Sequence, residues 1–385
     1  MKIRLSLLPL FISLVFLMSS CYEPPQDQQS ASMKEAEVWV GTYTRKEGHV
    51  DGKAAGIYRL QFEKDSLLSQ QTTEGIVNPS FLCLSPTANR IYAVSEIGPD
   101  VDTTGYVYSY QQEGDQLVFL NRQPTFSFAP CHVSIHPKGE WLYVANYVGG
   151  MIVRYPVAKN GKIEVASDTL RLEGQGPNER QDSSHPHSVT VSPDGYWVMV
   201  ADLGTDKVHT FSAEGALWEL ITTVELPGGS GPRHFAFHPR APYAYVLNEL
   251  NSTITAFHYN AENGALNIID HWSTLPDDFS DFSLGADLHF SPDGEFLYAS
   301  NRGDDSLAGF RVDTRDGSLE PVGYFPTRGA FPRNFAIHPD GKALLVANQN
   351  SDNVVQFSID PKNGKLRYEQ EWEVKTPVCL QFVNK

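Results

Sequence analysis

Five charged side chains are of the types needed to transfer protons and to stabilise a negative charge: His187, Arg233, Glu249, Arg302 and Arg333. A histidine or a carboxylate is the usual general acid or base of an active site. Guanidinium groups stabilise oxyanions and bind carboxylate or phosphate through paired N–H donors. The outermost two of the five are 146 residues apart (187 to 333), so the fold must bring them together.

The elements that carry these residues belong to a repeat. A stretch of sequence recurs six times, and its aligned prolines lie 46 to 56 residues apart: Pro86, Pro137, Pro193, Pro239, Pro292 and Pro339. Each copy contains strand-like segments rich in β-branched and aromatic residues, separated by Pro-Asp-Gly or Asn-Gly turns. A period near 50 built only of strands is typical of a β-propeller, with one four-stranded sheet per repeat.

Two fragments outside the six copies complete a seventh blade. The C-terminal segment 376–383 resembles a first strand, and segments 37–44 and 56–62 resemble a second and a third strand. Their union closes the ring and removes exposed sheet edges. We therefore predict an all-β fold, a seven-bladed β-propeller in a single domain over residues 37–385, whose last blade joins the N-terminal strands to the C-terminal strand.

The first residues predict export. Two basic residues precede an apolar run, 5–18, and small residues lead into Cys21. We predict that residues 1–20 are a signal peptide of the lipoprotein type, that Cys21 is lipidated and that 21–36 form a flexible tether. A transmembrane anchor is the weaker alternative, because about fourteen apolar residues are too few to span a bilayer. The protein is then lipid-anchored to a bacterial cell envelope, periplasmic or surface-facing.

The charge and the cysteines exclude several classes of partner. The chain has a net charge of −16, and loss of the two cations in residues 1–20 gives −18. Such a surface disfavours nucleic acid and anionic membranes, so we expect the protein to touch a membrane only through its anchor. We also expect a monomer. Cys83, Cys131 and Cys379 form no CxxC pair, which favours buried thiols over disulfides or a metal site.

One column of the repeat concentrates the candidate site residues. In a propeller the first strand of each blade lines the central channel. Six residues before the aligned proline, three copies carry His187, Arg233 and Arg333, whereas the others carry serine, cysteine or alanine. The fold does not require a charge there, and a charge is costly to bury without a purpose or a partner. This favours function over packing.

Neighbouring positions extend the column. The next residue of the same strand is histidine or aspartate in three copies, and the predicted substrate-binding residues are therefore Arg333, His132, His234 and Asp287. Glu249 and Arg302 follow the second strand of their blades, which runs antiparallel to the first and ends where the first begins. All these side chains should meet at one mouth of the channel. The structural alternative for Glu249 is a simple ion pair with an arginine, and Arg154 is expected to be a solvated strand charge.

The motifs of these strands resemble a known family, the seven-bladed lactonases. The motifs are HPHS (185–188), GPRH (231–234), YVLNELNS (245–252), GADLH (285–289), YASNR (298–302) and FPRN (331–334). The family includes propeller-type 6-phosphogluconolactonases and fungal carboxy-muconate lactonizing enzymes, and the resemblance covers the whole chain after the signal. A histidine, two arginines and a glutamate form the family's proposed active site, and they correspond to His187, Arg233, Glu249 and Arg302.

The resemblance implies a carboxylic ester hydrolase of carbohydrate metabolism that opens a sugar lactone at the channel mouth. Glu249 is favoured as general base with His187 as its acid/base partner, and Arg233 or Arg302 would stabilise the oxyanion. No Gly-x-Ser-x-Gly or HExxH motif supports a serine nucleophile or zinc, and we expect no metal or cofactor. A divalent ion held by Glu96, Glu249 and Asp202 is the weaker alternative.

Two other functions stay open at this point. A non-enzymatic surface propeller could bind a protein or glycan, although a pure scaffold would repeat one residue in every blade. A muconolactone-type cycloisomerase would use the same residues for proton transfer at carbon. The predicted export also bears on the substrate. The phosphorylated lactone of the family is cytoplasmic, so either the phosphorylated substrate or the predicted export does not apply to this chain. An exported enzyme would meet unphosphorylated aldonolactones or other extracellular lactones.

Overall fold

The computed structural model describes residues 35–383. The predicted signal peptide (1–20), the predicted lipidation site Cys21 and all but the last two residues of the predicted tether (21–36) lie outside the described residues. Within residues 35–383 every regular element is a β-strand, and no helix is long and apolar enough to cross a membrane.

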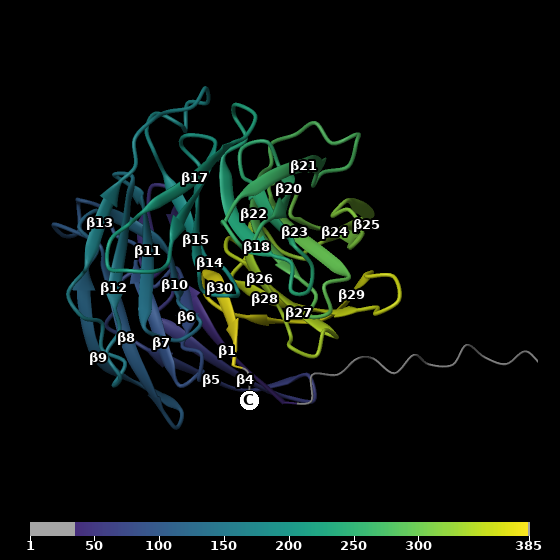
Figure 1. Ribbon diagram of the computed structural model, residues 1–385. Coiled ribbons are helices and arrows are strands. Elements are labelled where there is room, and N and C mark those ends of the chain that lie inside the picture. The colour runs from purple at the N-terminus through teal and green to yellow at the C-terminus, as the bar shows by residue number, and fades with distance from the viewer. Residues whose placement is uncertain (1–34, 384–385) are drawn as a thin grey trace, which may run out of the picture. The chain divides into compact units, whose positions relative to one another are not determined.

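The strands form seven antiparallel sheets of four strands each, which we number as blades in chain order (Figure 1). Blades 1 to 3 contain β6 (Leu82–Leu84), β7 (Arg90–Ser95), β8 (Tyr106–Glu113) and β9 (Gln116–Pro124); β10 (Phe128–Ile135), β11 (Trp141–Val148), β12 (Met151–Pro156) and β13 (Asp168–Arg171); and β14 (Pro186–Val191), β15 (Trp197–Asp202), β16 (Lys207–Ser212) and β17 (Leu220–Glu225).

Blades 4 to 6 contain β18 (Pro232–Phe237), β19 (Tyr243–Asn248), β20 (Thr253–Tyr259) and β21 (Leu266–Ser273); β22 (Leu284–Phe290), β23 (Phe296–Arg302), β24 (Ser306–Val312) and β25 (Leu319–Pro326); and β26 (Pro332–Ile337), β27 (Ala343–Asn348), β28 (Asn353–Ile359) and β29 (Leu366–Glu373). Blade 7 contains β30 (Pro377–Phe382), β1 (Glu35–Thr42), β4 (Ile57–Glu63) and β5 (Ser66–Thr73). A separate hairpin joins β2 (Lys46–Glu47) to β3 (Val50–Asp51).

The two ends of the chain close the fold, as the sequence predicts. β30 pairs antiparallel with β1, with Val40 opposite Leu380, and Figure 1 shows the last strand beside the first. The innermost strands contact one another in succession, β6, β10, β14, β18, β22, β26 and β30, and β30 returns to β6. This is the seven-bladed β-propeller predicted from the repeats, and β1 begins at Glu35, two residues before the predicted start of the domain.

The core lies between neighbouring blades. The second strands, such as β19 and β27, are buried along their whole length, whereas the outermost strand β5 alternates between exposed and half-buried residues. Buried tyrosines also link one blade to the turn of the next. Tyr245 and Tyr298 donate hydrogen bonds to the carbonyls of Gly317 and Gly364, at 2.8 and 2.7 Å. Both glycines have a positive φ, which other residues adopt only with strain.

Candidate active site

A β-bulge in the first strand explains why one column of the repeat is free to carry charge. The pairing of β14 with β15 shifts register between Pro186 and Ser188, and that of β18 with β19 shifts between Pro232 and His234. The residues skipped by the ladder are His187 and Arg233. Bulges re-aim a side chain without changing the rest of the strand, and the same shift recurs around Arg333 in β26.

The carboxylate of Glu249 is the centre of the site. Its Oε2 lies 2.9 Å from Arg233 Nε and 2.9 Å from Arg302 Nη2, and its Oε1 lies 2.6 Å from Arg180 Nη1. The Nε2 of His187 lies 3.9 Å from Oε2. The side chain of Glu249 is 2% exposed. The structure therefore brings together all four residues that the family resemblance implies, and it adds a third arginine.

Two of the arginines are held by the backbone of blade 5. Arg302 Nη2 donates to the carbonyl of Gly285 at 2.9 Å, and Arg233 Nη1 donates to the carbonyl of Ala286. Their side chains are 5% and 3% exposed. Arg233 Nε makes no hydrogen bond, so its contact with Glu249 is ionic. Buried guanidinium groups fixed in this way form a preorganised positive wall around the carboxylate.

Electrostatics sets the protonation of the central pair. Burial raises the pKa of Glu249, but Arg302, Arg180 and Arg233 outweigh it and hold that pKa well below its usual range. Burial and then Arg233 lower the pKa of His187 well below its ordinary value. At neutral pH the site thus contains an ionised carboxylate and a neutral imidazole.

The predicted substrate-binding residues His234 and Asp287 have protein partners. His234 Nε2 lies 3.0 Å from Arg233 Nη1, and its Nδ1 lies 2.6 Å from Asp287 Oδ1. Asp287 Oδ2 in turn contacts His289 Nε2 at 2.8 Å and accepts a hydrogen bond from Asn334. Both residues are buried. This chain of contacts ends on Arg233, so it bears on the orientation of that guanidinium.

The other two predicted binding residues lie on different sides of the cluster. The ring of His132 packs on Phe81, at 4.3 Å between centroids, and edge-on to His234 at 5.6 Å. Arg333 is half-buried, donates to the hydroxyl of Tyr43 at 3.1 Å and lies over that ring. Among the ion pairs of residues 35–383 none includes Arg333, whose guanidinium contacts Tyr43.

Arg180 is the residue that the sequence analysis missed. It lies in the connection between β13 and β14, outside the repeat, so no comparison of repeat positions includes it. Its Nη2 also donates to the hydroxyl of Tyr147 at 3.2 Å, and Tyr147 packs edge-on to His187. One signal was present. The spacing of 56 residues between Pro137 and Pro193 is the largest of the five, which indicates an insertion at this point.

Other features of the described residues do not add chemistry to the site. Among residues 35–383 no group of three or more His, Cys, Asp or Glu side chains is placed to hold a metal ion. Asp202 accepts hydrogen bonds from Ser184 and from the backbone of His185 and Gly204, as a turn cap does. Cys83, Cys131 and Cys379 are free thiols.

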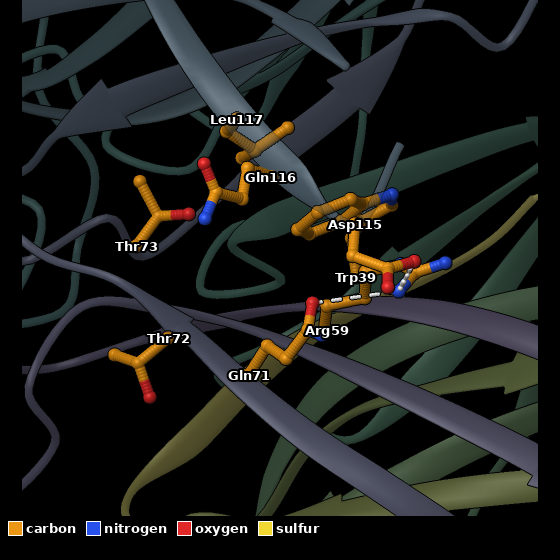
Figure 2. A pocket seen from close by; sticks show the side chains of 8 residues that line it. All are labelled: Trp39, Arg59, Gln71, Thr72, Thr73, Asp115, Gln116 and Leu117. Carbon is orange, nitrogen blue, oxygen red and sulfur yellow. Dashed lines mark hydrogen bonds and ion pairs between the residues drawn. The ribbon is translucent and has the colours of Figure 1, made fainter. Parts of the chain in front are cut away.

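A cavity of about 510 Å³ lies between the outer strands of blades 7 and 1 (Figure 2). It is lined by Arg59 and Asp115, which form an ion pair at 2.7 Å, and by neutral side chains that include Trp39. A second ion pair joins Arg59 to Glu37 at 2.8 Å. The guanidinium of Arg59 is therefore already paired with two carboxylates, and none of the residues around Glu249 lines this cavity.

The fold and the site together define a propeller lactonase. Residues 37–382 match the family described as Lactonase, 7-bladed beta-propeller, and the chain belongs to this family. A curated relative is the 6-phosphogluconolactonase of Bacillus subtilis strain 168, 34% identical over 301 residues, which are 77% of this chain and 83% of the relative. Another is the 6-phosphogluconolactonase of Formosa agariphila, 34% identical over 312 residues, 78% of this chain and 86% of the relative.

Solved structures agree with this assignment. The periplasmic gluconolactonase PpgL of Pseudomonas aeruginosa superimposes with a TM-score of 0.84 at 32% sequence identity, covering 91% of this chain and 99% of that chain. A protein from Lactobacillus plantarum superimposes with a TM-score of 0.83 at 31% identity, covering 91% and 100%. The similarity thus extends over the whole described propeller.

Proposed function

We propose that this protein is a lactonase that hydrolyses a sugar lactone at the Glu249 site. The observation that carries the proposal is the buried Glu249 carboxylate, which contacts Arg233 and Arg302 and faces His187. These are the residues implied by the family resemblance, and the curated relatives named above are 6-phosphogluconolactonases. Opening a lactone requires an activated water and stabilisation of a tetrahedral oxyanion, and this set of side chains offers both.

His187 is the better candidate for the general base. The sequence favours Glu249 in this role, but three guanidinium groups hold the pKa of Glu249 so low that it is a weak base. His187 is neutral and has Nε2 on the side of the carboxylate. In our scheme His187 removes a proton from the attacking water, and the charge of Glu249 stabilises the imidazolium that forms. His187 then returns the proton to the leaving alkoxide, so the ring opens to the hydroxy acid.

Arg302 and Arg233 would stabilise the oxyanion. Both are fixed by backbone carbonyls and by Glu249, so little reorganisation is needed when negative charge develops on the lactone oxygen. Arg333 would bind the polar substituents of the sugar ring together with Tyr43. We assign His234 and Asp287 a positioning role, since both are buried, His234 contacts Arg233 and Asp287 contacts His234. His132 would form the wall behind them.

The experiment compares two freshly prepared lactones, glucono-δ-lactone and 6-phosphoglucono-δ-lactone, each corrected for spontaneous opening. Wild type, Glu249→Gln and Arg302→Ala are assayed side by side, with circular dichroism to check folding. Loss of activity in both folded variants supports the site, and the preferred lactone tells whether phosphate matters. A wild type with no activity above background would favour a binding propeller or a cycloisomerase instead.

We propose further that the protein is exported and lipid-anchored through Cys21. The support is the residue pattern of positions 1–21, together with a similar solved protein described as periplasmic. Membrane fractionation of wild type and Cys21→Ala tests the anchor. The wild type should sediment with membranes, whereas the variant should remain with the soluble fraction. Equal distribution of the two proteins would contradict lipidation.

A further inference from the structure

Arg180 is held less firmly than the other two arginines around Glu249. Arg233 and Arg302 each donate to a backbone carbonyl of blade 5, whereas the guanidinium of Arg180 contacts only Glu249 and the Tyr147 hydroxyl among residues 35–383. Its side chain is 39% exposed. Arg180 therefore covers the solvent side of Glu249, and its guanidinium can leave without breaking a buried backbone hydrogen bond.

The main chain next to Arg180 is fixed. The side chain of Gln181 is fully buried and its Nε2 donates to the carbonyl of Leu203 and to Asp206, both at 2.8 Å. Its Oε1 accepts from the backbone N–H of Asn178 at 3.1 Å. The connection is thus anchored on blade 3 at the residue that follows Arg180. A movement of the guanidinium is a change of side-chain rotamer and does not require the loop to open.

The site has an excess of positive charge in an acidic protein. The guanidinium groups of Arg180, Arg233, Arg302 and Arg333 act on the carboxylates of Glu249, Glu96 and Asp287, so four positive charges face three negative ones. The whole chain has a net charge of −16. Local charge opposite in sign to the rest of the surface is arranged for a ligand of the other sign. Here that ligand is an anion.

We propose that Arg180 is an anion clamp, whose guanidinium moves from Glu249 to a carboxylate or phosphate carried by the lactone at a position away from its carbonyl. This inference rests on the proposed lactonase function and narrows its substrate class to lactones with a second, anionic group. The planar guanidinium suits both anions because it offers paired N–H donors. The same movement uncovers Glu249 and His187 only when a suitable ligand arrives.

The test measures binding of the open-chain products by isothermal titration calorimetry, which does not depend on turnover. The ligands are gluconate, 6-phosphogluconate and glucarate, so that the second anion is absent, a phosphate or a carboxylate. The proteins are wild type, Arg180→Ala, Arg180→Lys and Arg171→Ala. The last variant is a matched control, because Arg171 is the last residue of β13, directly before the same connection, and contacts the carbonyl of Gly149 rather than Glu249.

The clamp predicts a selective loss. Arg180→Ala should weaken binding of 6-phosphogluconate, glucarate or both by about tenfold or more, as expected for a lost hydrogen bond between charged groups. The affinity for gluconate should change much less. Arg180→Lys should restore only part of the lost affinity, because lysine cannot bind an anion in a bidentate way. Arg171→Ala should leave all three affinities near wild type. The ligand that responds identifies the anion.

Two results would overturn the proposal. Equal weakening of all three ligands by Arg180→Ala would mean that Arg180 only orients Glu249, and no weakening would mean that it is a surface ion pair. The outcome is separable from that of the lactonase assay. If wild type hydrolyses glucono-δ-lactone but Arg180→Ala weakens all three ligands equally, the lactonase function is supported and the anion clamp is rejected. If Arg180→Ala weakens only the ligands with a second anion but wild type hydrolyses no lactone, the anion clamp is supported and the lactonase function is rejected.

Discussion

His234 stands directly behind Arg233, with its Nε2 3.0 Å from the Nη1 of that arginine. Because the other ring nitrogen of His234 lies 2.6 Å from Asp287, the proton sits on Nδ1 and Nε2 is left to accept from the guanidinium. Arg233 is thus fixed from two sides, by His234 and by Glu249. The orientation of this proposed oxyanion-stabilising group therefore depends on the buried carboxylate of Asp287, which holds His234 in place.

We expect Asp287→Asn to lower kcat by about 10- to 100-fold with a smaller effect on KM, because misplacement of Arg233 weakens contacts made in the transition state. The measurement is steady-state hydrolysis of the preferred lactone. His289→Gln is the control, since it removes the outer, half-exposed partner of Asp287 and leaves the contact with His234 in place. A kcat reduced equally by both variants would indicate a general structural effect instead.

The contact between Asp287 and His289 predicts a pH range in which it stabilises the fold. Burial raises the pKa of Asp287, but His289 and His234 outweigh it and hold that pKa well below 3.8. Burial lowers the pKa of His289, but Asp287 outweighs it and raises that pKa above 6.5. Stability from a lowered carboxyl pKa is present above 3.8 and lost below it. Stability from a raised imidazole pKa is present below 6.5 and lost at higher pH.

The stability difference between wild type and Asp287→Asn should therefore be largest between about pH 4 and 6.5 and should narrow on both sides. His234 does not add to this window, because burial and Arg233 outweigh Asp287 and lower the pKa of His234 to about 4, so that its ring is neutral there. Urea unfolding at a series of pH values measures this difference. A gap that is constant from pH 3 to 8 would show that the ion pair adds nothing to stability.

Replacement of His187 tests the choice of base. His187→Ala should reduce kcat by about 10²- to 10⁴-fold, because general base catalysis is lost. Added imidazole should restore part of the rate in this variant, since the lost side chain leaves a space beside Tyr147 and His234, whose rings lie 5.5 and 5.6 Å from it. Imidazole should not restore Glu249→Gln. A His187→Ala enzyme with nearly full activity would return the role of base to Glu249.

The fold could be predicted from the sequence because every blade repeats the same turn and strand signals. The N-terminal and C-terminal segments outside the six copies together supply the strands of one further blade. The sequence also predicted that four residues come together at one end of the channel: His187, Arg233, Glu249 and Arg302. This was possible because the position of a residue within the repeat determines which end of the channel it occupies. The sequence could not reveal the bulges that aim His187 and Arg233 into the site. Arg180 escaped prediction because a residue in an insertion has no counterpart in the other blades.

For Arg154 the sequence correctly predicted a position in a strand but not the environment of the side chain. The expected solvated charge is fully buried. Its guanidinium donates to the carbonyls of Ala213 and Leu217 in the neighbouring blade and lies 4.4 Å from the centroid of Trp141. No acidic residue in the described chain forms an ion pair with Arg154. Main-chain carbonyls from a turn in another blade satisfy it, and a sequence does not show where such carbonyls will lie.

We therefore expect Arg154→Met to lower the free energy of unfolding by about 2 to 4 kcal/mol, because buried carbonyls lose their donors. Arg311→Met is the matched control. Arg311 also lies on a third strand and packs over an aromatic ring, but its side chain is 39% exposed and its acidic partner is Glu295. We expect the control to change stability by less than about 0.5 kcal/mol. Chemical denaturation followed by tryptophan fluorescence measures both, and lactone hydrolysis should be unchanged in each folded variant. An Arg154→Met protein as stable as wild type would mean that the carbonyls find water or new donors, and that this buried cation is not needed for the contact between blades 2 and 3.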